Sequence, residues 1–205
     1  MNKQEYMRKV FRMFFFYWLI TAVGVFLGQY LPSFFHLPLF VLSIVLLFLA
    51  AFLQNRTTRL PKLIYISVAL ILGLTAYAGF ARFLDTLGPS LLYTIVLSIV
   101  IIFGLLGIFG YKLNLDLRKF GTYLFVALIV LLVVSLVAMV IPGSSILSLV
   151  LSGAGLLLFS LFTIYDFNRI ANTHGNPDNV VYDAFSLYIN LFNMIIDALN
   201  IASFR

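Results

Sequence analysis

Apolar residues occur in seven long runs along the chain, and short stretches with charges, glycine or proline separate the runs. A helix that crosses the hydrocarbon core of a bilayer needs about 20 apolar residues. Each run approaches that length, and a helix satisfies its backbone hydrogen bonds without water. The pattern predicts an all-α membrane protein, a seven-transmembrane-helix bundle. The predicted spans are residues 13–31, 37–53, 63–83, 90–110, 120–141, 145–165 and 181–204.

Breaks between the runs coincide with residues that end helices. Pro32 and Pro38 separate the first two runs, Pro61 precedes the third, and Gly-Pro and Pro-Gly pairs mark two later breaks. Because the linkers are short, consecutive helices should be antiparallel neighbours. We predict a single integral-membrane domain over residues 1–205. Its first run is longer than the apolar region of a signal peptide, so we expect an uncleaved span.

Composition supports a membrane protein and removes several classes of function. The chain is 63% hydrophobic and 10% charged, with a mean hydropathy of +1.11, whereas soluble domains are roughly 45–50% apolar and about 25% charged. The absence of cysteine excludes disulfides, thiol catalysis and thiolate metal sites. The net charge of +6 lies in short clusters, without zinc spacing or an RNA-binding signature, so we expect no nucleic-acid partner.

Lysine and arginine are distributed unevenly between the two sets of linkers. Eleven of them lie in the N-terminal arm and in alternate linkers, and the other linkers hold only Arg82. Because basic residues stay on the cytoplasmic side, this predicts a cytoplasmic N-terminus. The side of the C-terminus depends on whether the last run crosses fully. The eleven are Lys3, Arg8, Lys9, Arg12, Arg56, Arg59, Lys62, Lys112, Arg118, Lys119 and Arg169.

The last run carries a stripe of polar side chains. Ser186, Asn190, Asn193, Asp197 and Asn200 are spaced by four, three, four and three residues, which returns to one face of a helix. Such a face cannot contact lipid without leaving polar groups unsatisfied. We therefore predict that the last helix is central and surrounded by the other six. The stripe can supply hydrogen bonds between helices or line a path for ions or protons. Five residues in register favour the path.

Two acidic residues are placed at membrane depth by the pattern, where an unpaired charge is costly. Asp166 precedes Arg169 by one helical turn, so a membrane-edge ion pair is one interpretation. Asp197 lies near the end of the last run and could be a solvated acid at a helix end. Asp166 and Asn190 can lie level on adjacent antiparallel helices. If the chain binds calcium, as the family resemblance described below implies, Asp166 and Asp197 are the carboxylates expected to contact the ion, because calcium prefers oxygen ligands.

Three segments together resemble a known family: TAVGVFLGQYLP in the first run, SLFTIYDFNRI in the sixth, and FSLYINLFNMI in the seventh. The chain resembles the Bax inhibitor-1 family, also called the transmembrane Bax inhibitor motif family, in its bacterial form. The resemblance implies a seven-helix fold with a central last helix, and a pH-sensitive calcium leak channel. Bacterial members are linked to control of a membrane-anchored AAA protease, and eukaryotic members to suppression of cell death.

The pH sensor of that family is a pair of aspartates, and the resemblance places them at Asp166 and Asn190. A basic residue at the inner end of the second helix holds the pair, which corresponds to Arg56 or Arg59 here. Two adjacent carboxylates share a proton, but an aspartate and an amide cannot. We therefore expect pH gating to be weakened or shifted to acidic pH.

The sequence allows a leak channel or a contact regulator and disfavours an enzyme. We predict a pH-sensitive calcium leak, with Ser186, Asn193, Asp197 and Asn200 along the path. Calcium is the expected permeant ion, and calcium ions and protons are the expected partners. The alternative is a non-conducting regulator that acts by contact, for example on a membrane-anchored AAA protease, through the arm MNKQEYMRKVFR. An enzyme is disfavoured, because no HExxH or Ser–His arrangement is present, and both histidines are predicted in loops. We expect no cofactor, and a monomer in a prokaryotic plasma membrane.

Overall fold

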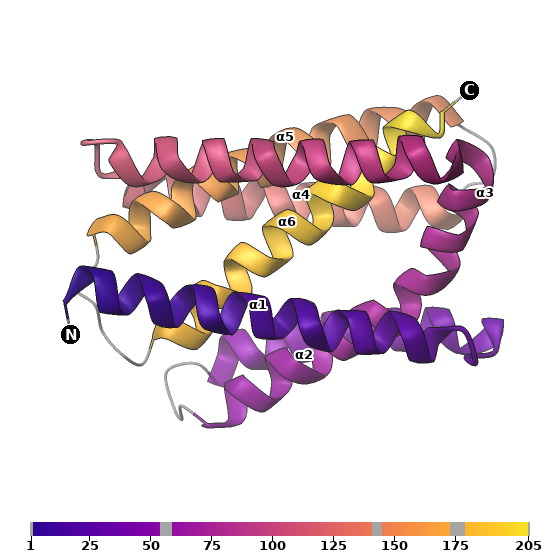
Figure 1. Ribbon diagram of the computed structural model, residues 1–205, viewed down its shortest axis with the longest axis horizontal. Coiled ribbons are helices and arrows are strands. Elements are labelled where there is room, and N and C mark those ends of the chain that lie inside the picture. The colour runs from indigo at the N-terminus through magenta and orange to yellow at the C-terminus, as the bar shows by residue number, and fades with distance from the viewer. Residues whose placement is uncertain (1, 54–58, 141–144, 173–178, 205) are drawn as a thin grey trace. The chain divides into compact units, whose positions relative to one another are not determined.

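The computed structural model describes residues 2–53, 59–140, 145–172 and 179–204 (Figure 1). Within these ranges the chain is helical, without a β-strand, as predicted. Short 3-10 segments, η1 (Ser33–Phe35) and η2 (Leu117–Phe120), precede α2 and α4. The six α-helices are α1 (Lys3–Gly28), α2 (His36–Leu53), α3 (Arg59–Lys112), α4 (Gly121–Val140), α5 (Ser145–Asn172) and α6 (Val180–Ala202).

Five of these helices, α1, α3, α4, α5 and α6, are long and apolar enough to cross a membrane. In α2 the apolar stretch His36–Leu47 is shorter. The seven predicted spans are therefore not confirmed as seven helices, because the runs 63–83 and 90–110 both belong to α3. That helix has 54 residues and is interrupted at Gly88, where φ is 75° and ψ is 162°. Glycine adopts this conformation readily because it lacks a Cβ atom.

Several predicted boundaries shift. The helix α5 continues to Asn172 rather than ending at 165, so Asp166 lies inside a helix. The helix α1 already begins at Lys3, where the Asn2 side chain accepts a hydrogen bond from the Glu5 N–H at 2.8 Å. The prolines predicted between helices, Pro38 and Pro61, lie in the first turns of α2 and α3. Proline is tolerated there because the first N–H groups of a helix have no intrahelical acceptor.

The described chain forms two compact units. The first contains α1, α2, α3 as far as Arg82, and α6 as far as Tyr188. The second contains α3 from Phe83, η2, α4, α5, and α6 from Ile189. Both α3 and α6 therefore contribute residues to each unit.

Glycines bring α1 and α3 close together in the first unit. A Cβ atom added to Gly24 would lie 2.9 Å from the Gly73 Cα, and one added to Gly28 would lie 2.8 Å from the Tyr77 Cβ. Small residues allow helix backbones to approach closely within a membrane. The Thr21 hydroxyl lies 2.6 Å from the Tyr188 hydroxyl and donates to the Ala69 carbonyl at 3.2 Å. These contacts join α1, α3 and the first part of α6.

In the second unit α4 and α5 run side by side (Figure 1). Glycines again allow close packing, because a Cβ atom on Gly110 of α3 would lie 2.9 Å from the Ile164 Cα of α5. The most apolar stretch of α4 has no buried residue. In the most apolar stretch of α6, 56% of the residues are buried, the largest share among the five long helices. This burial agrees with an inner last helix, but its enclosure by six others stays a prediction.

Candidate functional site

A buried carboxylate joins α5 to α6 within the second unit. Asp166 is 1% exposed, and its Oδ2 accepts a hydrogen bond from Asn190 Nδ2 at 2.8 Å. Its Oδ1 lies 3.0 Å from the Arg169 guanidinium. The predicted Asp166–Asn190 pairing and the predicted Asp166–Arg169 ion pair are both confirmed as contacts. The site therefore contains one carboxylate, one amide and one guanidinium.

Local helix geometry explains this arrangement. Arg169 follows Asp166 by three residues, so both lie on one face of α5. The Arg169 guanidinium carbon also lies 5.6 Å from the ring centroid of Tyr165, a distance at which a cation is attracted to an aromatic face. Asn190 comes from α6 and is 3% exposed. A cation and a hydrogen-bond donor thus face the two oxygens of the Asp166 carboxylate.

The remaining polar residues of α6 do different things. Asn193 donates to the Ile189 carbonyl of its own helix at 2.8 Å. Ser186 is half-buried and belongs to the first unit, whereas Asn200 is exposed. Asn190 forms a hydrogen bond to another helix, through its amide to Asp166 of α5. The path along this face of α6 stays a prediction.

Asp197 lies deeper than its position near the end of α6 suggests. Its carboxylate packs against Gly155 of α5, where an added Cβ atom would lie 2.9 Å from the Asp197 Cγ. Gly155 is in the middle of the apolar part of α5, which runs from Ile146 to Ile164. The interpretation of Asp197 as a solvated acid at a helix end is therefore disfavoured. Within the described residues no hydrogen bond or ion pair reaches this carboxylate.

The basic residue expected from the second helix is not placed. Arg56 lies outside the described residues, and Arg59 begins α3 without a described side chain. Arg169 is the basic partner of Asp166 in the part that the structure describes. His36 begins α2 rather than lying in a loop, and His174 lies outside the described ranges.

No group of three or more His, Cys, Asp or Glu side chains in the described ranges could hold a metal ion. Six to eight oxygen ligands are usual for calcium. Contact of calcium with Asp166 and Asp197 therefore stays a prediction.

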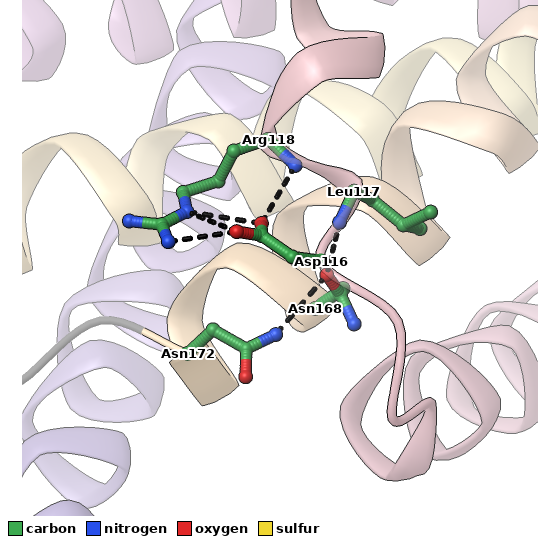
Figure 2. Close-up of polar contacts among 5 residues, drawn as sticks. All are labelled: Asp116, Leu117, Arg118, Asn168 and Asn172. Atoms are coloured by element: carbon green, nitrogen blue, oxygen red, sulfur yellow. Dashed lines mark hydrogen bonds and ion pairs between the residues drawn. The ribbon is translucent and has the colours of Figure 1, made fainter.

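Sequence analysis missed Asn168, which lies between Asp166 and Arg169 on α5 and is 0% exposed. Its amide donates to the carbonyls of Gly110 at 3.3 Å and Leu113 at 3.0 Å. Its oxygen accepts from the Leu117 N–H at 3.1 Å and from Asn172 at 3.2 Å (Figure 2). Asn168 thus joins α5 to the end of α3 and the start of η2. The available signal was a third polar residue in YDFNRI, next to Arg169 and two positions after Asp166.

A second buried carboxylate in the first unit was also missed. The Tyr6 hydroxyl donates to Asp183 Oδ2 at 2.6 Å, and the two residues are 1% and 3% exposed. This bond ties the start of α1 to the first turn of α6. Because 177 residues separate the two partners, no local pattern could indicate the pair.

These features together indicate the class of protein to which the chain belongs. Long apolar helices, small residues at helix contacts and a buried ion pair are those of an all-helical integral membrane protein. A family model described as "Inhibitor of apoptosis-promoting Bax1" matches residues 3–205. The chain belongs to this family, the Bax inhibitor-1 family.

Individual relatives share parts of the sequence. An uncharacterized protein of Helicobacter pylori is 39% identical over 101 residues, which cover 49% of this chain and 43% of that protein. One from Deinococcus radiodurans is 29% identical over 178 residues, 83% of this chain and 75% of that protein. Protein LIFEGUARD 1 of Arabidopsis thaliana is 29% identical over 118 residues, 57% of this chain and 50% of that protein. The chain spans less than half the length of the Helicobacter relatives that it matches.

Proposed function

We propose that this protein is a calcium-permeable cation leak of the Bax inhibitor-1 type, with its gate at the contact between Asp166 and Asn190. The observation that carries the proposal is the buried Asp166 carboxylate, which Asn190 of α6 and Arg169 of α5 hold at 2.8 and 3.0 Å. Membership in the family supports a channel-like or regulatory role in a membrane. Calcium ions and protons are the proposed permeant species.

The gate is proposed at this contact because a movement of α6 against α5 must break the hydrogen bond between Asn190 and Asp166. If α6 moves against α5, the Asp166 carboxylate loses its amide donor while it is still buried. Arg169 stays beside Oδ1, because it belongs to the same helix, but Oδ2 of a buried carboxylate loses its hydrogen-bond donor, which is unfavourable, so the contact favours the closed arrangement. A neutral carboxyl group is a poorer hydrogen-bond acceptor than a carboxylate, so protonation of Asp166 would weaken the same contact. Because Asn190 donates to the ionised form, we expect the leak to depend only weakly on pH near neutrality.

The proposed topology has seven crossings, two of them made by α3. A straight helix of 54 residues would be ~80 Å long, more than twice the ~30 Å hydrocarbon core. Gly88 is the proposed turn between the two crossings. We further propose a monomer in a prokaryotic plasma membrane, with its N-terminus in the cytoplasm and the polar face of α6 directed to the path.

Calcium flux into proteoliposomes tests this function. Wild type, Asp166→Ala and Asn190→Asp are compared at acidic and basic pH. The proposal expects measurable flux with weak pH dependence in wild type, higher flux in Asp166→Ala because the closing contact is absent, and steeper pH dependence in Asn190→Asp. If no variant moves calcium at any pH, the leak is refuted. The contact regulator is then tested by co-purification with membrane-anchored AAA proteases.

A further inference from the structure

The connection between α3 and α4 presents an exposed surface of two kinds of side chain. Three are basic, and three are large and apolar, with Leu115, Phe120 and Tyr123 exposed by 64%, 57% and 73%. They lie where the apolar part of α3 ends and that of α4 begins, which is the level of a membrane interface. We call this the α3–α4 surface: Lys112, Leu115, Arg118, Lys119, Phe120 and Tyr123.

The surface keeps a net positive charge. Arg118 lies 2.7 Å from Asp116, and its side chain and backbone N–H both donate to that carboxylate (Figure 2). These hydrogen bonds lower the pKa of Asp116 to about 2, so the pair stays ionised and its charges cancel. Lys112 and Lys119 form no ion pair with a described residue. The positive charges of Lys112 and Lys119 can therefore attract an anionic partner.

The surface is held in shape by α5. Asn168 donates to the Leu113 carbonyl, which precedes Asp116 in the chain. It also accepts from the Leu117 N–H, which follows Asp116 (Figure 2). At the start of α4, a Cβ atom on Gly121 would lie 2.7 Å from the Tyr165 Cζ, so the backbone there rests on the tyrosine ring. A connection fixed in this way loses little conformational entropy when a ligand binds.

We propose that the α3–α4 surface binds the headgroup of an anionic phospholipid. Lys112 and Lys119 attract its phosphate, and basic residues close to a bilayer favour anionic lipids. Phe120 and Tyr123 have the aromatic character found at membrane interfaces. The adjoining α4 has no buried residue in its apolar stretch, so it offers its side to acyl chains. A lipid whose tails lie along α4 places its headgroup beside the two lysines.

Lipid binding at this surface would act on the proposed gate. Tyr165 contacts Gly121 at the surface and also lies beneath the Arg169 guanidinium, which is paired with Asp166. A bound lipid that steadies the start of α4 is therefore expected to favour the closed Asp166–Asn190 contact. This consequence depends on the proposed function, whereas the binding itself does not.

Native mass spectrometry of the full chain in detergent tests the binding, with phosphatidylglycerol and phosphatidylcholine as probes. The test variant is Lys112→Gln/Lys119→Gln. Its matched control is Arg8→Gln/Arg12→Gln, which removes the same charge from exposed positions of α1. We expect wild type and control to retain phosphatidylglycerol, and the test variant to retain several-fold less. Phosphatidylcholine binding should not change.

Two results would overturn the proposal. Equal loss in the test variant and the control means general attraction by positive charge, and no loss in the test variant means that no lipid binds there. The variant Asp116→Asn sharpens the test, because it releases the charge of Arg118. It should retain more phosphatidylglycerol than wild type, and an equal or smaller amount contradicts the electrostatic account. None of these readouts depends on calcium flux, so a failed leak and a failed lipid site are distinguishable.

Discussion

The carboxylates of Asp166 and Asp197 lie between the same two helices but are accommodated in opposite ways. Asp166 is 1% exposed and has both an amide donor and a guanidinium partner. Asp197 is half-buried, has no hydrogen bond or ion pair within the described residues, and fits because Gly155 leaves room. A hydrogen bond and an ion pair stabilise the Asp166 carboxylate, whereas the Asp197 carboxylate occupies room left by the missing side chain of Gly155. Under the proposed function, the first controls a contact between α5 and α6, whereas the second is available to an ion on the proposed path.

Removal of a partner of Asp166 should have the largest effect. Arg169→Gln leaves a buried carboxylate without its cation, and breaking a buried ion pair costs about 3–5 kcal/mol. Chemical denaturation of the purified protein in detergent should show a loss of that size. Arg118→Gln is the matched control, because its ion pair is exposed and solvent-screened and should contribute far less. Equal losses in the two variants would contradict the special position of Asp166.

Filling the space beside Asp197 should have an intermediate effect. Gly155→Ala places a Cβ atom against the Asp197 carboxylate, and overpacking of a buried contact costs about 1–3 kcal/mol. Gly153→Ala is the control, because a Cβ atom there meets nothing within 4 Å and alanine favours helix. Thermal unfolding should separate the two variants. Gly155→Ala should also cost less in an Asp197→Ala background, and the same cost in both backgrounds would show that the carboxylate is not the obstacle.

Substitution of each aspartate by its amide compares the two sites directly. Asp197→Asn removes no partner, so we expect a change in unfolding free energy of less than about 1 kcal/mol. Asp166→Asn separates Arg169 from its counter-charge and should be several-fold more costly. Denaturation of both variants under one condition checks this. A larger loss in Asp197→Asn than in Asp166→Asn would reverse the comparison.

The exposed Asp116–Arg118 pair should show the smallest effect, as a reference for the buried pair. Hydrogen bonds from Arg118 hold the pKa of Asp116 at about 2, below its ordinary value of 3.8. The contribution of a lowered pKa is present above the unfolded value and is lost as pH falls through the folded one. Arg118→Gln should raise the Asp116 pKa toward 3.8, which carboxyl NMR titration can measure. An unchanged pKa would assign the shift to another cause.

Much of the fold follows from apolar runs and breakers. The all-helical class and the residue range of α4 were predictable. A single run of apolar residues in lipid can satisfy its backbone hydrogen bonds only as a helix. The seven-helix bundle was not confirmed, although α3 consists of two helical stretches that meet at a kink at the non-helical Gly88. The extent of α5 was missed because Asp166, Asn168 and Arg169 look like a polar helix end, although their partners lie on other segments.

The candidate site was only partly predictable, for a related physical reason. Asp166 and Arg169 are three residues apart, so helix geometry alone places them together. The expectation that consecutive helices are antiparallel neighbours allowed the pairing with Asn190, and the hydrogen bond between the two side chains shows the contact. The depth of Asp197 could not be predicted, because it depends on where α6 crosses α5, and only the contact with Gly155 reveals that position.

The central claim is that the Asp166–Asn190 contact gates a calcium leak, and the pH dependence of flux in wild type and Asn190→Asp tests it most directly. A second carboxylate at position 190 would share a proton with Asp166, so flux in the variant should vary more steeply with pH than in wild type. Identical pH dependence in the two proteins would contradict the claim, because the residue facing Asp166 would then have no influence on conduction.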